Sequence, residues 1–207
     1  MKVLLVRHGE TIENTKHILQ GCTPGTLTDE GRRQADATGR ELRLRLAALL
    51  PESDNPVPKE SAVPEESAGL ASLGLASLGL AGDASAVQLL SSDLQRCKDT
   101  TAIINAHLHL PVEYTPLLRE RDWGSITGMV VDGITKVRIP DDAETVSQMK
   151  ARARQFLNLA ASHHKASVVI AVSHGLFCRC LQAVHRGVEI ADVERMHNGE
   201  IREIILR

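Results

Sequence analysis

Near its start the chain reads Val3-Leu4-Leu5-Val6-Arg7-His8-Gly9-Glu10-Thr11, and this stretch indicates the fold class. Its first four residues are continuously apolar and rich in strand formers, as is typical of a strand buried on both faces in a parallel sheet. The apolar run ends abruptly at Arg7 and His8. Ligands of open α/β sheets bind beyond the carboxyl ends of the strands, so these two residues are candidates for a functional site.

The same pattern recurs further along the chain. Strands are predicted at Val87 to Leu90 and at Ser167 to Val172, and shorter ones near Val112 to Tyr114 and at Ile201 to Leu206. Helical segments separate these strands. The alternation predicts an α/β fold, three layers in the order α/β/α with a mostly parallel central sheet.

Four helices are predicted from apolar spacing and capping residues. The first begins at Thr28, a candidate cap, and ends near Pro51. The second follows Asp93, which is again a candidate cap. The other two are indicated by apolar residues at helical spacing: Val146, Met149, Ala153, Phe156, Leu157 and Ala160, then Phe177, Leu181 and Val184.

Bulk composition limits the class of protein. The 207 residues suit one domain over residues 1–207, and 43% hydrophobic residues is ordinary for a globular chain. A formal net charge of -2 argues against nucleic acid or an anionic membrane as partner. The run 3–6 is too short for a signal peptide, and no stretch is apolar enough to span a bilayer. We therefore expect a cytoplasmic protein with free thiols at Cys22, Cys97, Cys178 and Cys180.

Residues 51–86 interrupt the pattern and are predicted to form a flexible surface insertion. The first half is rich in Pro, Glu and Ser, and the second half repeats Gly69 to Leu73 at a five-residue step. Such a step fits neither the helical nor the strand period, so the leucines cannot collect on one face. The alternative interpretation is a segment that docks on a protein partner.

Three predicted strand ends should meet at one edge of the sheet: Arg7-His8, Ser91 to Arg96, and Ser173-His174-Gly175. A lone histidine there is more often structural, and a lone arginine is usually solvated. Two arginines and two histidines together indicate a site for a dianion, because the planar fork of arginine matches phosphate oxygens. Gly9 and Gly175 would let the backbone approach the ligand closely.

These residues resemble the histidine phosphatase superfamily, in its phosphoglycerate mutase-like branch. The resemblance rests on Arg7 to Thr11 with Asn14, Leu27 to Gly31 with Gln34-Ala35, Ser91 to Arg96, and Ser173 to Gly175, in this order. It covers the chain apart from residues 51–86 and implies a phosphoglycerate mutase-like fold.

The resemblance also implies roles in phosphoryl transfer. His8 would be the nucleophile that becomes phosphorylated, and Arg7, Arg96 and His174 would bind the transferring group. A histidine attacks phosphorus only when it is neutral, and neighbouring arginines disfavour its protonation. A cluster of cations can also stabilise charge as magnesium does in other enzymes, so we expect neither a metal nor a cofactor.

Further positions carry over in the same way. Glu120, within Leu118 to Gly124, would be the proton donor, because a bound phosphate dianion favours its protonated form. A surface carboxylate paired with Arg119 or Arg121 is the competing interpretation. The phosphate and substrate pocket would be lined by Asn14, Gln20, Gly21 and Gly175.

The sequence favours a metal-independent phosphomonoesterase of the histidine acid phosphatase type, acting on a small phosphorylated metabolite. True mutases of the resembled family carry further basic residues after the proton-donor segment. Between Gly128 and Glu144 this chain has only Lys136 and Arg138. A cofactor-dependent phosphoglycerate mutase is the alternative.

Overall fold

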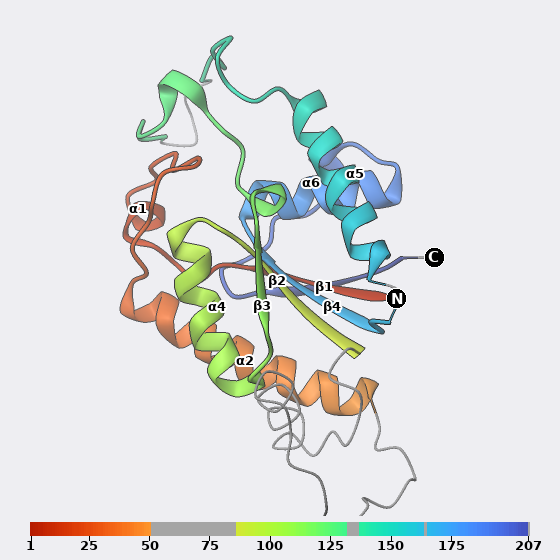
Figure 1. The fold of residues 1–207 in the computed structure, drawn as a ribbon. Coiled ribbons are helices and arrows are strands. Elements are labelled where there is room, and N and C mark those ends of the chain that lie inside the picture. Colours follow the sequence, from red (N-terminus) through yellow and green to blue (C-terminus); the bar gives the residue numbers. More distant parts are fainter. Residues whose placement is uncertain (51–85, 132–136, 164, 207) are drawn as a thin grey trace, which may run out of the picture.

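The computed structural model describes residues 1–50, 86–131, 137–163 and 165–206 (Figure 1). At its centre is a sheet with the strand order β3-β2-β4-β1-β5. The strands are β1 (Lys2–Arg7), β2 (Val87–Ser92), β3 (Val112–Thr115), β4 (Val168–Ser173) and β5 (Ile201–Ile205). The pairs among β1 to β4 are parallel, whereas β5 runs antiparallel beside β1. The prediction of a mostly parallel sheet is confirmed.

Helices cover both faces of this sheet (Figure 1). One face carries α2 (Asp29–Leu49) and α4 (Gln95–Leu108), and the other carries α5 (Val146–Ser162) and α6 (Gly175–Arg186). The shorter elements are α1 (Ile12–Thr15), η2 (Pro116–Leu118), η3 (Gly124–Ile126) and η4 (Ile190–Asp192). The structure is therefore the predicted three-layer α/β/α arrangement.

The two helical layers explain why the first strand is continuously apolar. Leu4 and Val6 of β1 belong to the same buried cluster as Leu42 of α2. Leu5 points to the opposite face, into the cluster that contains Phe156 of α5. Because successive side chains of a strand alternate between faces, both faces must be apolar where both are covered.

The predicted helix starts are confirmed at Thr28 and corrected at Asp93. The side-chain oxygen of Thr28 accepts a hydrogen bond from the backbone N–H of Gly31 at 2.9 Å and caps α2. At α4 the cap position is Leu94, which makes no side-chain cap hydrogen bond. The carboxylate of Asp93 instead accepts from Nε of Arg119 at 2.6 Å, so it is not available to the helix.

The predicted insertion at residues 51–86 lies outside the described residues, except for Ala86. The carbonyl of Ala86 accepts the N–H of Ser167 at 2.9 Å and so extends the contact between β2 and β4. Lys136 also lies outside the described residues, and Arg138 is exposed. In the described part of the chain, no helix has the length and apolar character needed to cross a membrane.

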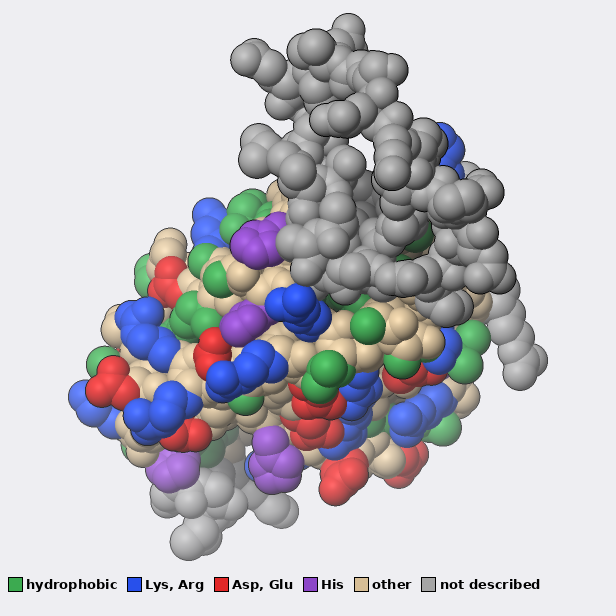
Figure 2. Space-filling model, turned by 90° about the horizontal axis from the view of Figure 1, so that it is seen from below, with side chains coloured by type: hydrophobic (Ala, Val, Ile, Leu, Met, Phe, Trp, Pro, Cys, Tyr) green, Lys and Arg blue, Asp and Glu red, His purple; other side chains and the backbone are tan. Residues whose placement is uncertain are grey.

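Charged side chains of both signs are intermixed on the face shown in Figure 2. Along α2, opposite charges pair at the spacing of one helical turn. The pairs are Arg33 with Glu30, Arg40 with Asp36, and Arg45 with Glu41. Much of the positive charge of this helix is therefore neutralised locally.

Candidate active site

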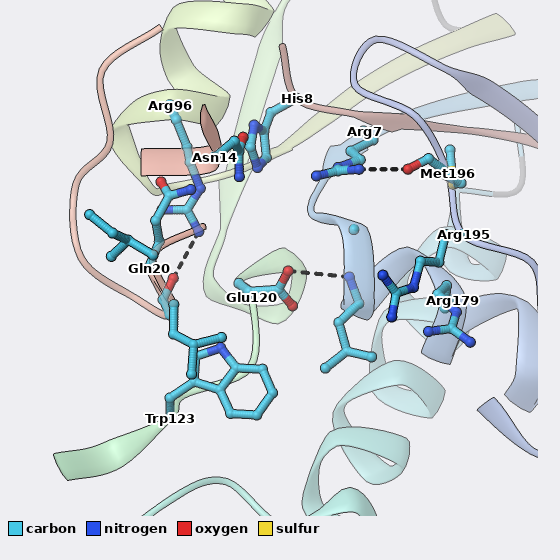
Figure 3. Close-up of a pocket in the computed structure, with 15 residues that line it drawn as sticks. Arg7, His8, Asn14, Gln20, Arg96, Glu120, Trp123, Arg179, Arg195 and Met196 are labelled. Carbon is cyan, nitrogen blue, oxygen red and sulfur yellow. Dashed lines mark hydrogen bonds between the residues drawn. The ribbon is translucent and has the colours of Figure 1, made fainter. Parts of the chain in front are cut away.

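The predicted strand ends meet at one edge of the sheet. Arg7 at the end of β1 pairs in register with Ser173 at the end of β4, and Ser91 of β2 pairs with Val172. The segments that follow these strands therefore leave the sheet at the same level. A cleft of about 410 Å³ opens there (Figure 3). Its lining includes eight of the predicted site residues: Arg7, His8, Asn14, Gln20, Gly21, Arg96, Glu120 and Gly175.

His8 lines this cleft with one particular ring nitrogen free. Its Nδ1 lies 2.7 Å from the carbonyl oxygen of Gly9. A carbonyl oxygen can only accept, so Nδ1 carries the proton and donates it. The other nitrogen, Nε2, then holds the lone pair. The geometry thus selects the tautomer in which Nε2 can act as a nucleophile.

The electrostatic environment keeps His8 neutral. Burial lowers its pKa well below the ordinary histidine value, and the nearby cations Arg96 and Arg7 lower it further. The hydrogen bond to Gly9 acts weakly in the opposite direction. The direction expected from the two arginines is confirmed, but loss of hydration is the larger cause.

Arg96 is a fully buried arginine whose guanidinium is fixed by three acceptors. Its Nη1 donates to the carbonyl of Thr23 at 2.7 Å and its Nη2 to that of Gly21 at 2.8 Å. Its Nε donates to Nδ1 of His174 at 3.1 Å. One N–H remains on each terminal nitrogen and can donate to an oxyanion.

His174 lies behind the cleft and does not line it. Because its Nδ1 accepts from Arg96, its proton is on Nε2, which lies 2.9 Å from the hydroxyl oxygen of Ser92. Its ring centroid is 5.1 Å from that of His8. Burial lowers its pKa well below the ordinary value, and Arg96 adds to this effect. The structure brings His174 into the cluster but places both ring nitrogens on protein partners.

Arg7 has an unusual buried donor. Its Nη1 donates to the carbonyl of Met196 at 2.6 Å (Figure 3). Its Nε is buried and has no hydrogen-bond partner among the described residues. A buried donor without a partner is unfavourable in the empty site.

Glu120 is held by the start of α6 (Figure 3). Its carboxylate accepts the backbone N–H groups of Leu176 and Phe177, each at 3.2 Å. The competing interpretation of an ion pair is wrong for both neighbours. Arg119 binds Asp93, and Nε of Arg121 donates to a backbone carbonyl. The free N–H groups at the helix terminus attract the carboxylate and fix it in the cleft.

Three further predicted residues lie in or after the short helix α1, and two of them, Asn14 and Gln20, bond to the residue that caps it. Thr11 caps this helix, and Oδ1 of Asn14 accepts the Thr11 N–H in return. That exchange leaves the amide N–H₂ of Asn14 as a donor on the cleft side. Nε2 of Gln20 donates to the hydroxyl of Thr11 at 2.9 Å. Gly21 has a φ of 51°, a left-handed conformation that glycine adopts without strain.

The two glycines after the histidines each lie against protein atoms. A Cβ on Gly9 would lie 2.3 Å from the backbone oxygen of Gly31, so Gly9 allows the loop to pack against α2. A Cβ on Gly175 would lie 3.1 Å from Nε of Arg7. Both glycines make room for protein atoms, although Gly175 also lines the cleft.

Several residues that line the cleft were not predicted from the sequence: Trp123, Arg179, Arg195 and Met196. Arg179 could have been found, because it follows Gly175 by four residues and so lies on the same face of α6. Arg195 had no such signal, since it lies in the irregular segment between η4 and β5.

The cleft is suited to anions. Its side-chain donors include guanidinium N–H groups, which bind phosphate oxygens. Within the described residues, no three His, Cys, Asp or Glu side chains are grouped as metal ligands would be. A neutral histidine and two arginines thus line one cleft at the strand ends of the sheet, an arrangement that could support phosphoryl transfer to histidine.

The family is established by comparison with known proteins. The model of the histidine phosphatase superfamily (branch 1) matches residues 3–50 and 67–206, so this chain belongs to that superfamily. The resemblance seen in the sequence is confirmed, and the protein is an enzyme of the histidine phosphatase class.

Proteins named as phosphatases and proteins named as phosphoglycerate mutases are both similar to this chain. An uncharacterized phosphatase, PhoE of Bacillus subtilis, is 29% identical over 177 residues, which are 84% of this chain and 71% of that protein. A probable phosphoglycerate mutase, GpmB of Erwinia tasmaniensis, is 27% identical over 210 residues, 94% of this chain and 79% of that protein. The solved structure of the open reading frame Rv3214 from Mycobacterium tuberculosis has a TM-score of 0.69 at 25% identity, covering 100% of this chain and 91% of that one.

Proposed function

We propose that this protein hydrolyses a small phosphomonoester through a phosphohistidine formed at Nε2 of His8. The observation that carries the proposal is the tautomer of His8. Its Nδ1 proton is donated to Gly9, which leaves the Nε2 lone pair in a cleft lined by Arg7 and Arg96. Neutrality, orientation and adjacent cations are the three properties that attack on a phosphate dianion requires.

In the first step a bond forms between Nε2 of His8 and phosphorus as the ester P–O bond breaks. The remaining N–H groups of Arg96 and the unpartnered Nε of Arg7 stabilise the negative charge on the transferring group. The departing oxygen takes its proton from the carboxyl group of Glu120, which lines the same cleft.

In the second step Glu120 accepts a proton from water, whose oxygen attacks phosphorus. The N–P bond breaks, inorganic phosphate leaves, and His8 regains its Nε2 lone pair. The backbone N–H groups of α6 hold the carboxylate in place for both steps. Glu120 thus regains the proton that it gave up in the first step, so no other group has to supply or remove one.

His174 acts in this proposal as a positioning residue. Its Nδ1 accepts from Nε of Arg96 and its ring lies edge-on to that of His8. Both contacts constrain groups that would touch the phosphate. Asn14 and Gln20 contribute to the pocket wall on the side of α1, where Asn14 can donate its amide N–H.

A phosphoglycerate mutase remains the second candidate, because the cleft contains Arg179 and Arg195 in addition to the phosphate-binding arginines. The same phosphohistidine would then return its phosphoryl group to a second hydroxyl instead of water. For either activity we propose a cytoplasmic enzyme with a small phosphorylated substrate. The three buried cysteines, all free thiols, suit a reducing compartment.

The proposed function is tested with His8→Ala. Substitution removes the covalent route, so release of phosphate from glycerol 3-phosphate should fall to background. Brief exposure of the unmodified enzyme to ³²P-labelled substrate should give an acid-labile, base-stable label at His8. His185→Ala, which changes an exposed histidine on α6, is the matched control and should retain both activity and label.

Two results would contradict the proposal. Undiminished hydrolysis by the His8→Ala protein would exclude the phosphohistidine. Rapid conversion of 3-phosphoglycerate to 2-phosphoglycerate in the presence of the bisphosphate primer, with little inorganic phosphate, would replace hydrolysis by the mutase reaction.

A further inference from the structure

Two arginines that the reaction described above does not use lie on one wall of the cleft. Arg179 projects from α6, and Arg195 projects from the segment before β5 (Figure 3). Their positive charges interact, because Arg195 is among the groups that lower the pKa of Arg179. Arg195 also acts on the pKa of Arg7 in the same direction. This pair of arginines therefore adjoins the proposed phosphate site.

Neither arginine has a carboxylate partner. In the described part of the chain, ion pairs form at other arginines, and Glu194, next to Arg195 in sequence, pairs with Arg202 instead. The charged groups that influence Arg179 are themselves cations, Arg195 and Arg202. Like charges held together without a counter-charge raise the free energy of the empty site, and an anion would lower it.

The side chain of Arg179 is fixed in place before any ligand binds. Its Nε donates to the carbonyl of Val193 at 2.8 Å and its Nη2 to that of Ile190 at 2.9 Å. Its Nη1 makes no hydrogen bond to a described residue. Arg195 is exposed, and its guanidinium likewise donates to none of the described residues. One rigid and one adaptable guanidinium are thus available to a ligand.

The charge of the cleft exceeds what one phosphate can balance. Four arginines line it, Arg7, Arg96, Arg179 and Arg195, against the single carboxylate of Glu120. The net charge of these groups is at least 4 − 1 = 3 positive charges, since His8 is neutral. A phosphomonoester dianion supplies two negative charges, so at least one positive charge is left for a further anionic group.

We infer that Arg179 and Arg195 form a second anion subsite, and that the preferred substrate is a phosphomonoester that also carries a carboxylate. The claim that the substrate carries a phosphate ester rests on the proposed function. The claim that it carries a carboxylate depends only on the pair Arg179 and Arg195. These arginines come from α6 and the segment before β5, and not from the region between Gly128 and Glu144, where the mutases of the family carry additional basic residues.

The inference is tested by Arg195→Gln with two substrates that differ in one carboxylate. For 3-phosphoglycerate, kcat/KM should fall about tenfold, as expected for loss of one charge-assisted contact. For glycerol 3-phosphate, kcat/KM should change by less than about twofold, because it places no charge at this subsite. Arg195→Lys should recover part of the loss. Arg186→Gln, which removes an exposed arginine of α6 outside the cleft, is the matched control and should leave both substrates unaffected.

Binding measurements separate this inference from the proposed function. By titration calorimetry, the His8→Ala protein should bind 3-phosphoglycerate about tenfold more tightly than glycerol 3-phosphate, and His8→Ala/Arg195→Gln should lose most of this preference. If the His8→Ala protein shows this preference but the unmodified enzyme turns over neither substrate, the proposed hydrolysis is overturned and the subsite is retained. Equal binding of both ligands by the His8→Ala protein, or an equal effect of Arg195→Gln on both substrates, would overturn the subsite.

Discussion

Two neutral histidines, the buried Arg96 and the half-buried Arg7 occupy the centre of the site, and hydrogen-bond partners decide what each histidine can do. Gly9 takes the Nδ1 proton of His8, while Arg96 occupies Nδ1 of His174. The two rings therefore hold opposite tautomers. Only His8 has a lone pair facing the cleft, which is why it and not His174 is proposed as the nucleophile.

The proton-donor role of Glu120 can be tested through the leaving group. Glu120→Gln keeps an oxygen that can accept from α6 but has no proton to give. Hydrolysis of glycerol 3-phosphate should slow by about 10²- to 10⁴-fold, the range of general acid catalysis. Hydrolysis of p-nitrophenyl phosphate should slow much less, because its leaving group departs as a stable anion.

The control for this experiment is Glu113→Gln, which changes an exposed carboxylate of β3 away from the cleft. It should leave both rates unchanged. A loss of equal size on the alkyl and aryl substrates would remove Glu120 from the acid role and leave it as a structural ligand of α6.

At the scale of elements, the loop after β1 is held against the start of α2. Gly9 faces Gly31, and a Cβ on Gly31 would lie 2.0 Å from the backbone oxygen of Glu10. The hydroxyl of Thr28 also donates to the carboxylate of Glu10 at 2.9 Å. This contact holds the loop that carries His8 against the start of α2.

The contact predicts a reversal of the usual effect of Gly→Ala in a helix. Such a change normally stabilises a helix by about 1 kcal/mol. Gly31→Ala should instead lower the free energy of unfolding by about 1–3 kcal/mol, the usual cost of overpacking, because the new methyl group meets backbone that cannot move aside. Urea denaturation measures this difference. Arg32→Ala, at the exposed next position, should be nearly neutral, and a stabilised Gly31→Ala protein would show that the loop does not pack on α2.

Elements with a periodic pattern could be predicted from the sequence, and those without one could not. The apolar repeats indicated α2, α5 and α6. The sharp change from Val6 to Arg7 indicated the first of the strand ends that form the site. Asp93 was misassigned as a cap because its competing partner, Arg119, is 26 residues away in sequence. No pattern in the sequence around Asp93 indicates such a distant partner.

At the scale of the whole molecule, parallel topology explains why the site could be largely predicted. Parallel strands end at one edge, so residues as distant as Arg7 and Ser173 are brought into register. Arg195 and Trp123, which also line the cleft, come from irregular segments whose place depends on packing. Sequence patterns leave these segments undetermined, and Arg195 is one of the two residues to which we assign substrate preference.

The buried histidines also link the stability of the whole protein to pH. Burial lowers the pKa of His8 and of His174 well below the ordinary value. In the unfolded chain both histidines take up protons near pH 6.5. Below that pH the unfolded state therefore binds more protons than the folded state. The free energy of unfolding should consequently fall as the pH falls below about 6.5.

Each histidine that stays neutral in the folded state should add up to about 1.4 kcal/mol per pH unit to this slope, so the pair should add up to about 2.7 kcal/mol per pH unit. Urea denaturation between about pH 7.5 and 5 measures the slope in a range where most carboxylates stay ionised in both states. In His8→Asn the slope should fall by about half of the pair's contribution, because one of the two linked protons is gone. His185→Asn, which changes an exposed histidine, should leave the slope as in the unmodified protein. If His8→Asn kept the full slope, His8 would be protonated in the folded protein at these pH values, and a neutral Nε2 nucleophile could not be maintained there.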